Sequence, residues 1–299
     1  MIPKPSEAGA ALFAVLAMVL LLAGFATLGL QRLRAATDRA VDGEARAEAN
    51  LLANSGIAIA QSLISRTKAL SNRQQAALEK PISLPLGGGT VSLRFSDAGA
   101  CFNLNSLGSA KPGVKPQGSW NDLARLLVAS GIPQLDADGL ARATAASISS
   151  RNLLLADASE WLSVPGVTAA HFAAAGQVLC ALPNREVSAF NINSVTPEKL
   201  PLLVALGLTP DEARRALASR PADGWVSAND FWQQSRPEGV PDTQAASVVG
   251  TSSRWIRLQL VAANPRAAVG RDLMLDTIEN PARIASSVWL AVPQAATAA

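Results

Sequence analysis

An uncharged apolar run close to the first residue constrains this chain most. Residues 10–30 (AALFAVLAMVLLLAGFATLGL) contain no charged side chain. At about 1.5 Å of rise per residue, a helix of this length spans roughly the 30 Å hydrocarbon core of a bilayer. The alternative is a cleaved secretory signal, with Lys4 in its positive region and a soluble mature form starting near Thr27. Because the run exceeds the roughly 7 to 15 apolar residues of such signals, we predict a retained transmembrane helix.

The pattern after this run predicts that the helix continues into solvent. No proline occurs from Ser6 to Lys80. Apolar residues recur at spacings of three, four and seven, as one helical face requires; they are Leu33, Ala36, Ala40, Ala47, Leu51 and Ala58. We therefore expect residues 31–80 to form an amphipathic continuation that Pro81 ends, because proline lacks an amide donor.

The composition indicates a folded domain beyond the helix. The chain has 299 residues, of which 49% are hydrophobic and 16% charged, enough to bury one or two cores. The net charge is only +3, and the basic residues are scattered along the chain. No electrostatic footprint for nucleic acid or acidic lipid is therefore present.

The two cysteines, Cys101 and Cys180, are an even count that permits one disulfide. Two buried free thiols are the alternative, since free cysteine is common in protein cores. A domain outside the cytoplasm would favour the bond, because disulfides persist in oxidising compartments.

Strand patterns occur in two separate parts of the chain. Apolar residues alternate at 82–86 and 91–95 around Gly87-Gly88-Gly89, which predicts a β-hairpin. That glycine run lacks the Lys-Ser/Thr of a phosphate loop, so we interpret it as structural. Alternation returns at 255–262 and, more weakly, at 267–278 and 284–292, and residues 293–299 are expected to form a loose tail.

Between these parts, residues 103–250 are typical of short helices with caps. Four positions place an acceptor at the N-cap and an acid three residues later, and one places proline at N1; they are Ser119 with Asp122, Asp157 with Glu160, Thr209 with Glu212, Ser227 with Asp230, and Thr196-Pro197. We predict an α+β fold in which a long N-terminal helix packs on a small antiparallel sheet (81–102 and 251–292) with a large all-α insertion (103–250) between its strands.

Two short motifs occur twice. Residues 102–107 and 190–195 share the pattern F-N-apolar-N-S-apolar, in which asparagine is suited to bonding backbone where an extended segment turns into a helix. Residues 165–168 (PGVT) and 206–209 (LGLT) each lie between helical stretches. The second pair is similar to a helix-hairpin-helix turn, so an envelope-anchored DNA-binding protein is the alternative function. Against it, residues 151–242 hold seven basic and ten acidic side chains, where DNA binding requires the opposite sign.

No pattern indicates an enzyme. His171 is the single histidine, tyrosine is absent, and no catalytic signature occurs. Asp136 and Asp138 have the spacing of a calcium loop, but the remaining oxygen ligands are missing. We expect Asp138 to cap a helix that starts at Leu140.

Taken together, the motifs of this chain resemble the type II secretion minor pseudopilin K family. The resemblance is carried by a polar leader ending in glycine, the apolar helix and a set of shorter motifs, which are Cys101-Phe102-Asn103-Leu104-Asn105, Ser159-Glu160-Trp161, Val164-Pro165-Gly166-Val167, Cys180-Ala181-Leu182-Pro183, Phe190-Asn191-Ile192-Asn193-Ser194, Gly224-Trp225 and Asp230-Phe231.

The resemblance implies a subunit at the tip of the pseudopilus, acting in protein export. Residues 1–9 would be a leader that a prepilin peptidase removes after Gly9, which makes Ala10 the new N-terminus. The chain would cross the inner membrane once, with its N-terminus in the cytoplasm and its C-terminal domain in the periplasm. The implied partners are the I-, J- and H-type minor pseudopilins and the inner-membrane secretion platform, without nucleic acid or a small-molecule substrate.

Three places depart from the family pattern. Ala8 stands where a basic residue usually precedes the leader glycine, and residues 147–152 lack the acidic, tyrosine-bearing loop associated with calcium. We therefore expect no cofactor. Ala14, the fifth residue after the proposed cut, replaces a glutamate that pairs with the α-amine of the subunit above in a filament. A tip subunit has nothing above it, and an unpaired carboxylate in a bilayer costs roughly 2.5 to 3.5 kcal/mol, so alanine suits the tip.

Overall fold

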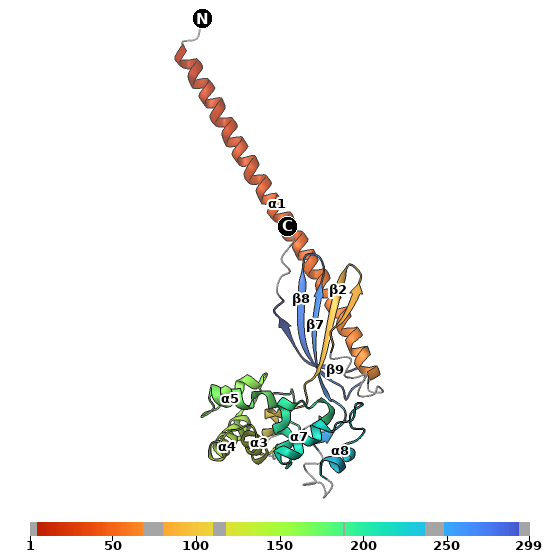
Figure 1. Cartoon of the computed structure of the whole chain (residues 1–299). Helices are drawn as coiled ribbons and strands as arrows, with labels where there is room; N and C mark the ends of the chain where they lie inside the picture. The colour runs from red at the N-terminus through yellow and green to blue at the C-terminus, as the bar shows by residue number, and fades with distance from the viewer. Residues whose placement is uncertain (1–4, 68–79, 110–117, 188, 237–247, 293–299) are drawn as a thin grey trace.

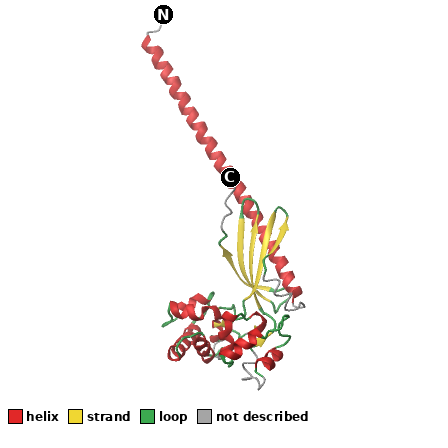
Figure 2. Cartoon of the chain, viewed as in Figure 1, coloured by secondary structure: helices red, strands yellow, loops and turns green. Residues whose placement is uncertain are grey.

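The computed structural model describes residues 5–67, 80–109, 118–187, 189–236 and 248–292, with side chains from residue 11 onward. It consists of one long helix, a sheet packed along the second half of that helix, and a helical domain at the far end of the sheet (Figures 1 and 2). The α+β fold class expected from the sequence is confirmed.

Helix α1 (Pro5–Thr67) is 63 residues long, which corresponds to roughly 95 Å. It begins at Pro5, so part of the expected leader is helical, whereas we expected the helix to start at Ala10. The described helix ends at Thr67, short of the expected stop at Pro81, and residues 68–79 lie outside the described residues. Figure 1 shows that its first half projects away from the rest of the molecule.

The second half of α1 packs closely on the sheet because its contact face is built from small residues. Its buried positions recur at helical spacing; they are Ala45, Ala49, Leu52, Ala53, Gly56, Ala60 and Ile64. A Cβ added at Gly56 would lie 2.6 Å from Val91 Cγ1 and 2.8 Å from Leu260 Cδ1. Glycine therefore sets the closest approach of helix and sheet.

The sheet has five antiparallel strands in the order β1-β2-β7-β8-β9. The strands are β1 (Ile82–Leu86), β2 (Gly89–Asp97), β7 (Trp255–Ala263), β8 (Ala268–Asp276) and β9 (Arg283–Leu290). The predicted hairpin is confirmed, with Gly87 and Gly88 in its turn at positive φ. Because β2 pairs directly with β7, the sheet is split in sequence by the insertion, as predicted. Its buried face contacts α1 through Val91, Leu93, Phe95, Leu258, Leu260, Leu273 and Leu275.

The insertion forms a second core around Trp161, Trp225 and Phe231. Its helices are η1 (Leu104–Leu107), α3 (Trp120–Ala129), α4 (Gln134–Ser150), η2 (Ala158–Ser163), α5 (Ala169–Ala175), η3 (Gly176–Val178), η4 (Ile192–Ser194), η5 (Pro197–Lys199), α6 (Leu200–Ala205), α7 (Pro210–Ala218) and α8 (Ala228–Ser235).

The expectation of an all-α insertion was wrong in one respect. Two short parallel ribbons occur in it: β3 (Phe102–Asn103) pairs with β4 (Leu179–Cys180), and β5 (Phe190–Asn191) pairs with β6 (Val249–Gly250). Strands of two residues are too short to show alternation, so the sequence pattern could not reveal them.

The predicted caps are largely confirmed. Asp157, Thr209 and Ser227 each form a capping box with the acid three residues later, and Pro197 occupies the first turn of η5. Ser119 caps α3 through the Asn121 N–H, but Asp122 pairs with Arg125 and does not complete a box.

The expectation for Asp138 was wrong. Helix α4 begins at Gln134, directly after Pro133, and Asp138 lies inside it, accepting a hydrogen bond from Gln134 Nε2 at 2.9 Å. The helix starts early because Ala137 already belongs to its buried face.

Candidate functional site

The free half of α1 is the first functional element. Gly9 and Ala10 lie on its backbone, and Ala14 is exposed. Its exposed large apolar side chains run from Leu12 to Leu33 without a protein partner. Soluble monomers rarely expose so large an apolar surface. In the described part of the chain, α1 is the one helix long and apolar enough to cross a membrane.

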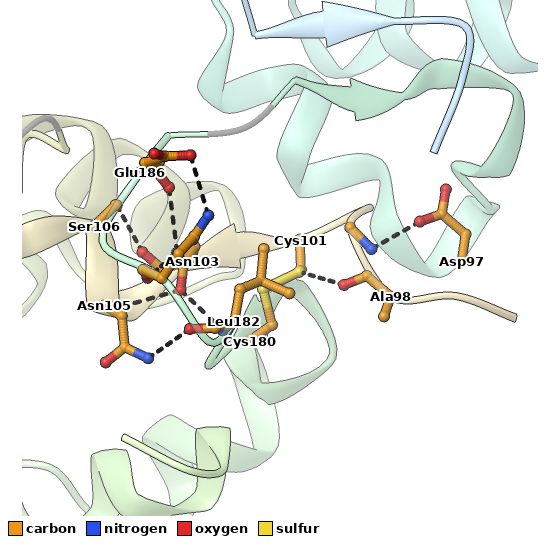
Figure 3. Close-up of a disulfide and its surroundings, with 11 residues drawn as sticks. Asp97, Ala98, Cys101, Asn103, Asn105, Ser106, Cys180, Leu182 and Glu186 are labelled. Carbon is orange, nitrogen blue, oxygen red and sulfur yellow. Dashed lines mark hydrogen bonds between the residues drawn. A yellow bond between two sulfur atoms is a disulfide. The ribbon is translucent and has the colours of Figure 1, made fainter. Parts of the chain in front are cut away.

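The second element is the disulfide at the base of the helical domain. Cys101 and Cys180 are bonded, with their Cα atoms 5.8 Å apart, and they lie where β3 runs beside β4 (Figure 3). The bond joins the chain leaving the sheet to the end of the first half of the insertion. The bond therefore keeps the start and the end of this half of the helical domain together where the domain joins the sheet.

Asn103 lies next to this bond and connects several backbone segments. Its Oδ1 accepts from the Leu182 N–H at 3.0 Å and from the Asn105 N–H at 3.2 Å. Its Nδ2 donates to the Asn184 carbonyl at 3.1 Å and to the Glu186 carbonyl at 3.3 Å, as Figure 3 shows for Glu186. The structural role predicted for this asparagine is confirmed, and it extends to residues about 80 positions away.

Asn105 and Asn193 make the same kind of contact in the two repeated motifs. Asn105 Oδ1 accepts from the Leu155 N–H at 2.8 Å, and its Nδ2 donates to the Leu155 carbonyl at 3.0 Å. Asn193 Oδ1 accepts from the Trp225 N–H at 2.8 Å, and its Nδ2 donates to the Trp225 carbonyl at 3.1 Å. Each asparagine thus pairs with both polar groups of one distant residue, as a strand partner would.

These contacts show that the insertion consists of two units of one plan, which we name unit 1 (residues 102–180) and unit 2 (residues 190–250). Each begins with a short strand and an asparagine-capped turn and continues through a helical hairpin. Each then has an asparagine-bound residue, a helix with a capping box and a returning parallel strand. Unit 1 carries the disulfide, and among the residues that the structure describes it alone has a helix in the place of α5.

The turns that join neighbouring helices in the two units contain glycine, which lets the helices pack side by side. Gly131, Gly166 and Gly207 lie between helices with φ of +92°, +87° and +98°, a conformation that favours glycine. The sequence signal found only the last two, because Pro133 stands in place of threonine after the first.

The amides of these turns are engaged within the protein. The Leu208 N–H donates to the Leu203 carbonyl, and the Thr209 N–H donates to Glu212 Oε2 at 2.6 Å. Hydrogen bonds from the Thr209 backbone and hydroxyl lower the pKa of Glu212, so its carboxylate stays ionised at this turn. In the other turn, the Thr168 N–H donates to His171 Nδ1, which gives the single histidine a capping role. This arrangement opposes phosphate binding and hence the DNA-binding alternative.

Charged groups join the helical domain to the end of the sheet. Arg254 Nη1 lies 2.6 Å from Glu186 Oε2 of the insertion, and Arg254 Nη2 lies 3.1 Å from Asp276 Oδ2 of β8. Ser253 donates to Asp97 at the end of β2 at 2.6 Å. Burial raises the pKa of Asp276, but hydrogen bonds from Arg254 and the Ile278 N–H outweigh it, so that the pKa falls below its ordinary value. The junction therefore depends on an ionised Asp276.

Within the described residues, no group of three or more His, Cys, Asp or Glu side chains is placed to hold a metal ion. Residues 147–152, where the calcium-associated loop was sought, contain the end of α4 and the start of the following loop.

Comparison with known proteins shows which family this chain resembles in sequence. A family model described as type II secretion system (T2SS), protein K matches residues 190–252, which coincide with unit 2. Type II secretion system protein K of Pectobacterium carotovorum subsp. carotovorum is 26% identical over 231 residues, covering 67% of this chain and 69% of that protein. A putative type II secretion system protein K of Escherichia coli (strain K12) is 28% identical over 183 residues, covering 51% and 56%. The chain is thus similar, in sequence, to several members of the type II secretion system protein K family.

These alignments span somewhat more than half of the length of the family members they match. The fold is also similar to a chain in the crystal structure of the GspK-GspI-GspJ complex from enterotoxigenic Escherichia coli. The TM-score is 0.61 at 21% identity, covering 83% of this chain and 99% of that one. The similarity of fold thus extends over most of this chain.

Proposed function

We propose that this chain is a minor pseudopilin at the tip of a type II secretion pseudopilus and takes part in protein export across the outer membrane. Its partners would be the I-, J- and H-type minor pseudopilins and the inner-membrane secretion platform. A prepilin peptidase would first cleave after Gly9. The observation that carries the proposal is the exposed apolar half of α1, in a chain whose residues 190–252 match the family model of type II secretion system protein K.

The arrangement of α1 supports a single-pass anchor. Residues 10–30 suit the bilayer core, while the sheet packs on α1 only from about Ala45 onward. With the N-terminus in the cytoplasm, the sheet and the helical domain would lie in the periplasm. The bonded Cys101–Cys180 pair fits that oxidising compartment.

The position of the helical domain supports the tip. It lies at the end of the sheet farthest from the free end of α1 (Figure 1), so it would face away from the membrane. A subunit added above would have to pass its own α1 beside this wide domain. Ala14 agrees with a subunit that has no neighbour above it, because it needs no partner in the bilayer.

Deletion and complementation test this function. Loss of the gene should stop the export of type II substrates into the medium and leave DNA uptake unchanged. The full chain should restore export, and a chain with Leu20→Lys and Leu21→Lys should not, because two lysines at the bilayer centre oppose insertion. Unchanged export, or a loss of DNA uptake, would contradict the proposal.

A further inference from the structure

Strand β9 forms an open edge of the sheet. It is eight residues long and pairs with β8 on one side. Among the residues that the structure describes, no strand lies along its other side. That side therefore presents a row of backbone N–H and C=O groups without strand partners, which can template pairing with another extended segment.

The two edges of this sheet differ. The opposite edge strand, β1, carries Pro85, which cannot donate to a further strand. The sequence of β9, RIASSVWL, contains neither proline nor lysine, and its single charge, Arg283, stands at the first position. Since proteins usually protect exposed edges with such residues, the bare β9 edge indicates a strand that is covered in an assembly.

The exposed Trp289 side chain lies at this edge in a fixed orientation. Trp289 is 62% exposed, and the guanidinium carbon of Arg271 lies 3.5 Å from the centre of its ring. Stacking on one ring face fixes the side chain while the other face remains open. Tryptophan residues that bury in an interface are frequent energetic anchors, and a ring fixed in advance loses less entropy on binding.

Apolar side chains flank the edge on both faces. Arg271 is two positions from both Val269 and Leu273, which pack in the core beneath α1, so it shares their face of the sheet. Its cross-strand partner Trp289 therefore also lies on the α1 side. Val288, 59% exposed, projects from the opposite face. An added strand would gain backbone hydrogen bonds along the edge and an apolar contact on each face.

A second copy of this chain does not suit the edge. Figure 1 shows the strands running roughly along α1. A closed dimer that pairs β9 with β9 in antiparallel fashion would point the two α1 helices in opposite directions. Two chains anchored in one membrane could not both insert. This geometry favours a different polypeptide as the occupant.

We propose that β9 accepts an extended strand, apolar at alternate positions, from a neighbouring pilin-type subunit, with Trp289 as the anchor. This inference rests on the proposed function, because a neighbouring subunit supplies the strand. It assigns the contact to the β9 side of the sheet and leaves the β1 side free.

Hydrogen exchange of backbone amides tests the contact. The full chain in detergent micelles is measured alone and with the full-length I-type and J-type pseudopilins of the same system. The edge amides of residues 283–290 should exchange at least about ten-fold more slowly in the complex, while those of residues 82–86 stay unchanged. A complex in which β9 exchange is unchanged overturns this inference and leaves the proposed function intact. Absence of any complex overturns both, and β9 protection that rises with the concentration of the chain alone shows a second copy as the occupant.

Two charge substitutions separate the edges. Val288→Lys should weaken binding of the I-type and J-type subunits at least about ten-fold, because a lysine on an edge strand opposes the addition of another strand. Val288 is exposed, so the substitution should leave the fold intact. Its matched control, Ser83→Lys on β1, should change binding by less than about two-fold. Equal effects of the two variants would overturn the assignment.

Discussion

Asn105 is expected to be the most important polar side chain in the helical domain. It is 1% exposed, and its amide makes three bonds to backbone groups more than forty residues away, to the Leu155 N–H, the Leu155 carbonyl and the Leu182 carbonyl. Asn105→Ala leaves all three groups buried without that partner. Each unpaired buried group costs about 1 to 3 kcal/mol, and water that enters the site relieves part of this cost. We therefore expect the free energy of unfolding to fall by about 4 kcal/mol.

Asn193 provides an internal comparison. Its amide bonds two groups of Trp225 and is less buried, so Asn193→Ala should cost about 2 kcal/mol. Asn105→Asp should be no better than Asn105→Ala, because a carboxylate keeps the acceptor for the Leu155 N–H but loses both donors. Asn121→Ala, at an exposed position of α3, is the control and should stay within about 0.5 kcal/mol.

Urea unfolding of the full chain in detergent, followed by tryptophan fluorescence, measures these free energies. Trp161 and Trp225 lie in the second core and report on it directly. The predicted order of destabilisation is Asn105→Ala, then Asn193→Ala, then Asn121→Ala. An Asn105→Ala variant within about 1 kcal/mol of the parent would refute the role assigned to these contacts.

Three further outcomes follow from the structure. N-terminal sequencing of the mature protein should begin at Ala10, and a start elsewhere would contradict cleavage after Gly9. A Cβ at Gly250 lies 3.6 Å from the Ala189 Cβ, so Ala189→Cys with Gly250→Cys should form a second disulfide, found by non-reducing mass spectrometry, that adds up to about 4 kcal/mol by closing unit 2; two alkylatable thiols would reject the equivalence of the units. Because the pKa of Asp276 is lowered from 3.8, its stabilisation is present above that value and is lost as pH falls through the folded pKa, so Asp276→Asn should flatten the acid part of the stability curve; an unchanged curve would exclude this residue as the source.

Local signals in the sequence predicted much of the fold. The uncharged run of residues 10–30 predicted the exposed half of α1, and alternation around Gly87 predicted the β1-β2 hairpin. Both depend on residues close together in the chain. Three capping boxes were found for the same reason, since an N-cap and its N3 residue lie within one turn. The periodicity after residue 30 predicted the wrong helical face, because Leu33 and Leu51 are 66% and 68% exposed, whereas Ala49, Leu52 and Ala53 are buried against the sheet.

Long-range pairings could not be predicted in this way. Asn105 and Leu155 are fifty positions apart, and nothing local to either residue indicates the other. The parallel ribbons are two residues long, and the open edge of β9 becomes visible only when the strand order is known. The wrong prediction for Asp138 has a different origin. Aspartate is a good N-cap residue, but the burial of Ala137 in the core makes the helix begin before Asp138.

Cross-linking in the membrane tests the tip position most directly. A single cysteine at Val15, which is 61% exposed on the free half of α1, would be introduced into the full chain. Equivalent cysteines would be placed in the N-terminal helices of the other pseudopilins, and all proteins would be produced together. We expect adducts with other minor pseudopilins and no chain of self-linked subunits. Ladders of this protein linked to itself along a fibre would show a shaft subunit and contradict the central claim.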